Sequence, residues 1–375
     1  MRKRILINAT ALSRDLTGLG VYTHALIQAL EAHFQHHKGV TLELYATERL
    51  FADLKSLEHY LAQKPSVGFL ARLKKPVRKW IQRRQQQALL EHAHFDLCIE
   101  PDYLPLVGVH AKKTLGCIHD VPMCDIQAWA VGKTYQKLWH TRLLAQMRAY
   151  DEVICFSECV KLDVLKALGL CESRVHKIYH GLREYRTLEV APLPPHLGAF
   201  ILVVGAKAKR RNVARLVEAF KLLPIDLQAR FKIVLTGAPN NLAKTELATL
   251  EHEKFIINLG YVSDALLQTL YAHARILWWG SLAEGFGLPM LEAMQAKLVV
   301  LASHVSCMPE ILGDAGIYCN PYNAQDIAKQ LERALTDETL RATCIAKGVE
   351  RVKQFSFKKS MRAHIEIIER ILRES

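Results

Sequence analysis

Short runs rich in β-branched and aromatic residues alternate with helical patterns along almost the whole of this 375-residue chain. This alternation is typical of parallel sheets whose strands are joined by helices. The runs fall into two series. The first comprises residues 4–8, 41–45, 97–100, 114–118, 152–156 and 175–179; the second comprises residues 200–204, 232–235, 255–259, 275–278, 298–301 and 316–318. The pattern predicts an α/β protein of two doubly wound domains.

A proline-rich stretch separates the two series. Residues 183–198 include Pro192, Pro194 and Pro195 and show little periodicity, as expected of a linker. The expected parts of the chain are a first domain, a linker, a second domain and an amphipathic helix that crosses back to the first domain, at residues 1–182, 183–199, 200–354 and 355–375. Ligands of such sheets lie beyond the carboxyl ends of the strands, which predicts a ligand in a cleft between the domains.

The composition is that of a globular protein, with 50% hydrophobic and 23% charged residues. A formal net charge of +13 favours anionic partners but does not choose among nucleotides, nucleic acid and acidic membranes. The nine cysteines are scattered and contain no Cys-x-x-Cys, which indicates free thiols in a reducing cytosol. Residues 5–12, which follow three basic residues, are interpreted as a buried strand and not as a signal peptide.

A basic amphipathic segment covers residues 69–84. Its positive charges alternate with apolar residues at three- and four-residue spacings, and Pro76 is expected to begin a new helix. The charged members are Arg72, Lys74, Lys75, Arg78, Lys79, Arg83 and Arg84. Binding in the plane of an anionic membrane would explain both the charges and Trp80. A solvated helix packed by one apolar face is an equally good explanation.

The richest segment is residues 281–294, Ser-Leu-Ala-Glu-Gly-Phe-Gly-Leu-Pro-Met-Leu-Glu-Ala-Met, between an apolar strand and a helix. Its glycines allow a ligand to approach the backbone closely. The amides of Phe286, Gly287 and Leu288 would point from a helix N-terminus toward an anion. The sequence therefore predicts a diphosphate cradle here.

Two carboxylates bracket this loop. Glu284 lies in the loop and Glu292 lies a turn into the helix. A carboxylate accepts two hydrogen bonds at once and therefore suits a pair of sugar hydroxyls. The alternative is a glycine-rich turn followed by a surface glutamate, but an exposed helix has no need of Gly-Phe-Gly.

The spacing of these two glutamates resembles the Glu-x7-Glu motif of retaining glycosyltransferases of family 4, which have the GT-B fold of two Rossmann-like domains facing across a cleft. The similarity extends along most of the chain. Other matching segments are residues 18–22, 95–96, 101, 119–120, 157–158, 180–181, 205–212, 260–264, 270–271, 306–310 and 313–315. The chain departs from the family pattern at Lys297, where Gly is common, and at His180, where Asn is common.

The resemblance implies roles for the acidic residues and for one histidine. Glu284 would contact the transferred sugar, and Glu292 would bind the ribose hydroxyls of the donor. His119, with Asp120 beside it, would lie near the reacting carbon on the acceptor side. From spacing alone, His119 is explained equally well as a core histidine at the end of an apolar strand.

The resemblance also implies which groups bind the donor diphosphate. Arg211 would do so with help from Arg210 or Lys207, and Gly20 would offer a backbone amide. A solvated charge run is the alternative reading of the two arginines. Tyr261 belongs to the segment that resembles the loop on the nucleoside side.

No Asp-x-Asp occurs in the sequence, so there is no obvious pair of carboxylates to hold Mg²⁺ or Mn²⁺ on a diphosphate. Arginines and a helix N-terminus would then offset the charge on the leaving group. We therefore expect neither a metal nor a cofactor. The other histidines, including His92 and His94, show no spacing that predicts a metal site.

Together with the resemblance, these features predict an enzyme that moves a hexose of the mannose or glucose type from a nucleotide-diphosphate sugar to a hydroxyl of a glycan or lipid-linked acceptor in cell-envelope or lipopolysaccharide synthesis. The resemblance alone implies that the enzyme is a retaining one. We expect no nucleic-acid partner, and a cytoplasmic location that includes peripheral contact with the inner face of the plasma membrane. Two alternatives stay open. One is a GT-B nucleotide-sugar epimerase or phosphorylase, and the other is a basic membrane- or nucleic-acid-binding module without catalysis.

Overall fold

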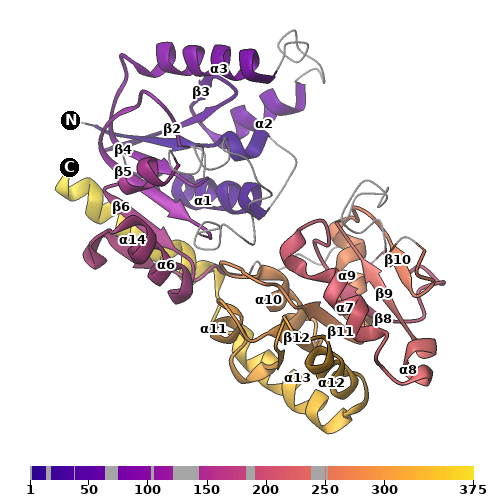
Figure 1. The fold of residues 1–375 in the computed structure, drawn as a ribbon. Helices are drawn as coiled ribbons and strands as arrows, with labels where there is room; N and C mark the ends of the chain where they lie inside the picture. The colour runs from indigo at the N-terminus through magenta and orange to yellow at the C-terminus, as the bar shows by residue number, and fades with distance from the viewer. Residues whose placement is uncertain are drawn as a thin grey trace.

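The computed structural model describes residues 2–13, 18–37, 39–63, 75–102, 105–120, 143–182, 191–237, 250 and 252–375, without the side chains of residues 75–80 and 83. It consists of two lobes, each built on its own sheet (Figure 1). The expected α/β architecture of two doubly wound domains is confirmed.

The first sheet has the strand order β3-β2-β1-β4-β5-β6-β7 and is parallel except for β3. Its strands are β1 (Lys3–Asn8), β2 (Val40–Ala46), β3 (Arg49–Phe51), β4 (His94–Glu100), β5 (His110–Ile118), β6 (Glu152–Cys155) and β7 (Val175–Lys177). The helices described with this sheet are α1 (Gly18–Phe34), α2 (Leu54–Gln63), α3 (Lys75–Leu90) and α6 (Glu158–Leu168). Pro76 lies in the first turn of α3, as the sequence predicts.

The second sheet is parallel, with the order β10-β9-β8-β11-β12-β13. Its strands are β8 (Ala199–Val203), β9 (Phe231–Leu235), β10 (Ile256–Asn258), β11 (Ile276–Trp279), β12 (Val300–Ser303) and β13 (Gly316–Cys319). The helices that accompany it are α7 (Val213–Phe220), α8 (Ile225–Arg230), α9 (Asp264–His273), α10 (Leu288–Gln295), α11 (Met308–Leu312), α12 (Ala324–Thr336) and α13 (Glu338–Val352). Trp278 and Trp279 are both fully buried and belong to different core clusters, because successive side chains of β11 point to opposite faces of the sheet.

One hydrophobic cluster runs through both domains. It joins Ile5 and Phe156 of the first domain to Trp279 and Phe286 of the second. The two sheets therefore share part of their core.

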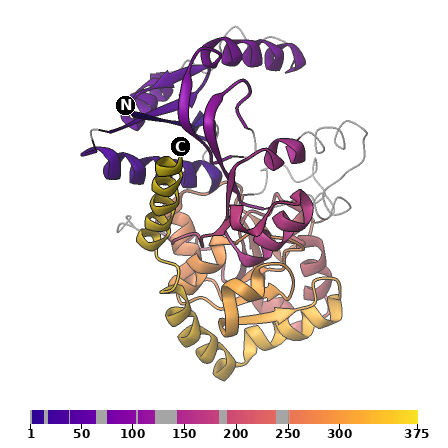
Figure 2. The same ribbon diagram turned by 90° about the vertical axis from the view of Figure 1, so that its left-hand side faces the viewer.

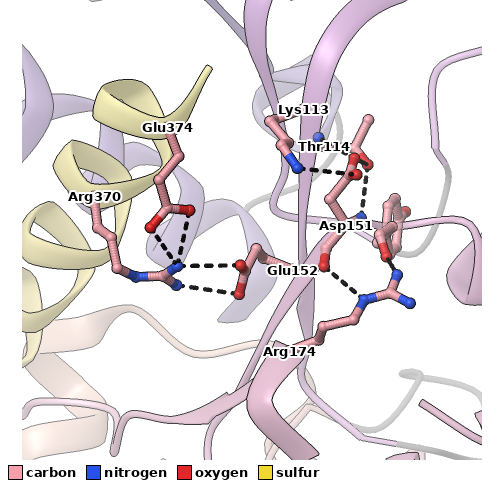
Figure 3. Close-up of polar contacts among 8 residues, drawn as sticks. Lys113, Thr114, Asp151, Glu152, Arg174, Arg370 and Glu374 are labelled. Atoms are coloured by element: carbon pink, nitrogen blue, oxygen red, sulfur yellow. Dashed lines mark hydrogen bonds and ion pairs between the residues drawn. The ribbon is translucent and has the colours of Figure 1, made fainter. Parts of the chain in front are cut away.

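Helix α14 (Phe357–Glu374) leaves the second domain and packs on the first (Figures 1 and 2). Gly181 makes this crossing possible, because a Cβ atom there would lie 2.1 Å from Cα of Phe357. Farther along α14, Arg370 makes a two-point ion pair with Glu152 of β6, at 3.2 and 3.3 Å (Figure 3). Such bidentate pairing fixes the direction of the helix as well as its position.

None of the helices in the described part of the chain is both long enough and apolar enough to cross a lipid bilayer. The eight cysteines described are all free thiols, and most of them are buried.

Candidate active site

The glycine-rich loop between β11 and α10 lies against the first domain. A Cβ atom on Gly285 would come within 1.7 Å of the backbone oxygen of His119, so only glycine allows this approach. The carbonyl of Gly285 also accepts a hydrogen bond of 2.7 Å from the hydroxyl of Ser157. The loop therefore meets the carboxyl ends of β5 and β6.

The N-terminus of α10 has no side-chain cap among the described residues. Gly287 precedes the helix with φ of +89°. Pro289 stands at the start of the helix, where its missing N–H is not needed. The first backbone N–H groups of a helix have no partner within it and attract anions. Phe286 is buried, whereas Gly287 and Leu288 are partly exposed.

Glu284 lies between two arginines, and the three side chains form the charged centre of the site. Its Oε1 accepts a hydrogen bond of 2.9 Å from Nε of Arg210 and another from Nη1 of Arg211. The same Nη1 also donates to the hydroxyl of Ser281 at 2.8 Å. The arginines follow β8 and the glutamate follows β11, and these strands are neighbours in the sheet. Residues 74 positions apart in the chain therefore meet at one sheet edge.

Both tryptophans of β11 hold Arg211 in place. The guanidinium lies over the ring of Trp279, and the indole N–H of Trp278 donates to the backbone oxygen of Arg211 at 3.0 Å. Burial and the neighbouring Arg210 lower the pKa of Arg211. A guanidinium starts so far above neutral pH that it keeps its charge, and Glu284 provides the opposite charge. From the sequence alone, these tryptophans are expected only as strand residues.

Glu292 extends the site along α10. It is half-buried, and its Oε2 accepts a hydrogen bond of 2.7 Å from the hydroxyl of Tyr271 on α9. This bond orients the carboxylate at the carboxyl edge of the second sheet.

His119 belongs to a stack of aromatic rings at the carboxyl edge of the first sheet. Its ring lies parallel to Phe156, with centroids 4.5 Å apart, and Phe156 lies on His180 at 3.8 Å. Tyr22 of α1 meets His119 edge-on at 4.8 Å. His180 in turn contacts Phe286 of the glycine-rich loop, with centroids 5.1 Å apart. The stack thus connects the two domains.

Hydrogen bonding sets the tautomer of the His119 ring, and burial sets its protonation state. Its Nε2 lies 2.9 Å from the backbone oxygen of Pro101 and therefore carries a proton. Desolvation lowers the pKa of His119 to about 4, so the ring is neutral at neutral pH. Desolvation also lowers the pKa of His180.

His364 supports this stack from the crossing helix α14. Its Nδ1 lies 2.8 Å from the carbonyl oxygen of Ser360, and its Nε2 lies 2.9 Å from the hydroxyl of Tyr22. Because the carbonyl can only accept, Nδ1 carries the proton and Nε2 accepts from Tyr22. No spacing in the sequence connects residues so far apart.

A buried carboxyl group, Glu100, lies at the end of β4 next to Pro101. It accepts hydrogen bonds from the side-chain amide of Asn8 at 2.7 Å and from the backbone N–H of Leu106 at 2.9 Å. Desolvation raises its pKa to about 7 despite these bonds. The backbone oxygen of Pro101 accepts the hydrogen bond from Nε2 of His119, so Glu100 lies next to the backbone that orients this ring.

A glutamate from the second domain holds the N-terminus of α6. The carboxylate of Glu310, on α11, accepts the backbone N–H groups of Glu158 and Cys159 at 2.7 and 3.1 Å. An acidic group at a helix N-terminus is favourable because it pairs with the open N–H groups and the helix dipole. This contact and the bond from Ser157 to Gly285 connect the domains at one end of α6.

The remaining predicted residues lie in other loops and helices of the two domains. Gly20 is buried in the first turn of α1, where backbone N–H groups have no partner within the helix. Asp120 follows His119 beside Gly285. Lys207 is exposed in the loop after β8, and Tyr261 is 80% exposed. Lys297 has φ of +57°, which explains why glycine is common at this position in the resembling family.

The sequence is similar to a known family and to several known proteins. Residues 189–351 match the family of glycosyl transferases group 1. The chain is 35% identical over 161 residues to O-antigen chain mannosyltransferase B of Escherichia coli, a match that covers 42% of each protein. It is 28% identical over 279 residues to the serotype-specific mannosyltransferase WbdA of the same species, covering 70% of this chain and 34% of that protein. The chain thus spans less than half the length of either relative.

Solved structures extend the similarity to the whole fold. The sucrose-phosphate synthase of Thermosynechococcus elongatus superposes over all of both chains with a TM-score of 0.73 and 16% identity. At this identity the likeness concerns the fold alone. Residues 189–351 are thus similar to the glycosyl transferases group 1 family, and the two domains of the chain form the GT-B fold.

Proposed function

We propose that this protein is a retaining mannosyltransferase that moves a hexose from a nucleotide-diphosphate sugar to a hydroxyl group of a glycan or lipid-linked acceptor. The second domain binds the donor and the first domain binds the acceptor. The observation that carries the proposal is the cluster of Glu284, Arg210 and Arg211 beside the N-terminus of α10. The mannosyltransferase relatives support mannose as the transferred sugar.

In the donor complex, the diphosphate takes a position between the two arginines and the first amides of α10. Glu284, which the arginines hold in place, accepts hydrogen bonds from hydroxyls of the transferred sugar. Glu292 accepts from the ribose hydroxyls, and Tyr271 keeps it oriented for this. Each carboxylate thus accepts hydrogen bonds from a pair of hydroxyl groups, because it has two acceptor oxygens.

During transfer, negative charge grows on the phosphate that leaves. Arg210, Arg211 and the N-terminus of α10 are already in place to stabilise this charge. Preorganised donors of this kind contribute roughly 3 to 4 kcal/mol each to the rate. We propose that these groups suffice without a metal ion. The acceptor attacks on the face from which the phosphate leaves, and a phosphate oxygen takes the acceptor proton.

His119 stands on the acceptor side as a neutral ring. Its proton at Nε2 is directed to Pro101, so the ring is held in one orientation. Its backbone oxygen lies against Gly285, next to the residue that binds the sugar. We place the reacting carbon between this backbone and Glu284.

The test is a panel of UDP, GDP and ADP with their sugars, including GDP-mannose, read first by thermal shift. A ligand at 100 times its dissociation constant adds about 2.7 kcal/mol to stability. The donor that stabilises the protein is then incubated with extracted envelope glycolipids. Release of free nucleotide only in the presence of an acceptor supports transfer. Release without an acceptor indicates an epimerase or a hydrolytic reaction, and EDTA-sensitive release contradicts metal independence.

The acceptor and its membrane are proposed from the sequence. The basic segment at residues 69–84 would hold the enzyme on the inner face of the plasma membrane, near a lipid-linked acceptor. Residues 69–74 and the side chains of residues 75–80 and 83 lie outside the described residues, and the helix α3 contains the rest. The positive charge and the amphipathic pattern of this segment support its binding to an anionic membrane.

A further inference from the structure

Two histidines and a glutamate converge where α14 passes the C-terminal end of α1. His33 is in the last turn of α1, His37 lies four residues later, and Glu369 is on α14. One nitrogen from each ring and one carboxylate oxygen all lie within 4.8 Å of one another. This cluster contains none of the residues of the candidate active site.

The geometry of the pair formed by His33 and Glu369 already brings two ligand atoms together. Nε2 of His33 lies 2.8 Å from Oε1 of Glu369. The two side chains are about a third exposed, at 29% and 35%. An ion could therefore enter from solvent while the two helices hold its ligands.

A hydrogen bond sets the tautomer of the second histidine. Nδ1 of His37 lies 2.9 Å from the backbone oxygen of His33, so Nδ1 carries the proton. This leaves a lone pair on Nε2, for which no hydrogen-bond partner is seen among the described residues. Metal-binding histidines commonly donate their other ring N–H to a carbonyl in this way. The rings of His33 and His37 lie 5.0 Å apart at 27°.

We propose that His33, His37 and Glu369 form a binding site for a divalent transition-metal ion, with zinc as its occupant. Two imidazole nitrogens and one carboxylate oxygen suit zinc, and water would take the fourth position. Binding releases the proton between His33 and Glu369 to solvent, because Nε2 must offer its lone pair to the ion. The sequence spacing of the histidines is not sufficient to predict the site, since the carboxylate comes from the far end of the chain.

The ion would join α14 to α1. The same two helices meet at the hydrogen bond between Tyr22 and His364, beside the ring stack of the candidate active site. Zinc would therefore stabilise the docking of the crossing helix without contacting the donor. The proposal does not depend on the proposed function.

The first experiment uses the 375-residue protein without an affinity tag, stripped with EDTA and titrated with Co²⁺. We expect visible d–d absorption that saturates at one ion per chain, followed by loss of this absorption when Zn²⁺ is added. His37→Ala and Glu369→Gln should each weaken cobalt binding at least tenfold. His36→Ala is the matched control, because this exposed histidine is adjacent but outside the cluster, and it should bind like the wild type.

The second experiment measures the melting temperature with Zn²⁺ at 100 times its dissociation constant. We expect a rise of about 2 to 5 °C in the wild type and in His36→Ala, and none in His37→Ala. Slower hydrogen exchange in residues 357–374 with zinc would support the link between the helices. Absence of cobalt absorption in the wild type, equal binding by His37→Ala, or a cobalt–thiolate charge-transfer band in place of the expected spectrum would overturn the proposal.

Discussion

The guanidinium carbon of Arg211 lies 3.6 Å from the ring centre of Trp279. A cation over a buried indole is stabilised by about 2 kcal/mol. Trp279→Leu should therefore weaken donor binding roughly threefold to thirtyfold, because Arg211 loses its fixed position, and should also lower the stability of the fold. Isothermal titration with the donor measures the first effect. Phe220→Leu is the control. It removes an equally buried aromatic ring of the second domain that is not part of the contact with Arg211. Equal donor affinity in the two variants would contradict the role of Trp279.

Glu284 and Glu292 should differ in the kinetic parameter that they affect. Glu284→Gln keeps the shape of the side chain but removes the charge between the arginines, and we expect kcat to fall about 100-fold or more with a small change in nucleotide affinity. Glu292→Ala should mainly raise the donor KM, by about tenfold, because a hydrogen bond to a charged group is lost. Steady-state kinetics measures both. Glu338→Gln, which removes an exposed ion pair with Arg275, should leave both parameters unchanged. Small and equal effects of the first two substitutions would refute the assignment.

Gly285 should tolerate no side chain. Gly285→Ala would place a carbon 1.7 Å from the backbone oxygen of His119, so the loop and β5 must separate. We expect loss of transferase activity and a lower melting temperature. Gly39→Ala is the control, since a Cβ atom there has nothing within 4 Å. If Gly285→Ala keeps normal activity, the loop does not need its contact with the first domain.

Glu100 should make stability fall as the pH rises toward neutrality. Its pKa is raised by burial from 4.5 to about 7, so between these values the folded protein holds a proton that the unfolded chain has released. This favourable contribution is complete below about pH 4.5 and is lost as the pH rises through 7. Glu100→Gln resembles the protonated carboxyl, so its free energy of unfolding should exceed that of the wild type increasingly from pH 5 to pH 8. Urea unfolding at a series of pH values measures this. A constant difference between the two proteins would show that Glu100 does not titrate in this range.

Charge at the basic segment should decide membrane binding. Each basic residue near an anionic surface contributes about 1 kcal/mol, so reversing Lys74, Lys75, Arg78 and Lys79 should reduce binding to phosphatidylserine vesicles by about a thousandfold or more. Activity on a water-soluble acceptor should remain. Vesicle sedimentation measures binding, and reversal of the four exposed lysines Lys329, Lys347, Lys353 and Lys359 is the control. Unchanged sedimentation of the first variant would refute the membrane role of this segment.

Much of the fold follows from local pattern. In the described part of the chain, every strand except β3 is expected from short β-rich runs between helical patterns. β3 forms a hairpin with β2 through Thr47 and Glu48, which both have positive φ. Such turns usually carry glycine or asparagine, so this pair gives no turn signal.

The candidate site is predictable where its residues follow neighbouring strands. Glu284 and Arg211 could be placed together because the loops after β8 and β11 share one sheet edge. His364 and Glu310 could not, because their roles depend on how α14 and α11 pack against another domain. His119 was ambiguous for a physical reason: its ring is buried in a stack and also lies at the sheet edge where a ligand is expected.

The path of α14 has a consequence for how the protein is made. Residues 357–374 are translated after the whole second domain, yet His364 and Arg370 contact α1 and β6, which leave the ribosome much earlier. During synthesis, the surface of the first domain that α14 covers therefore stays exposed to solvent until the second domain and α14 have been made. Separate expression of residues 1–182 would leave that surface permanently bare, and supplying α14 as a peptide is the natural way to restore it.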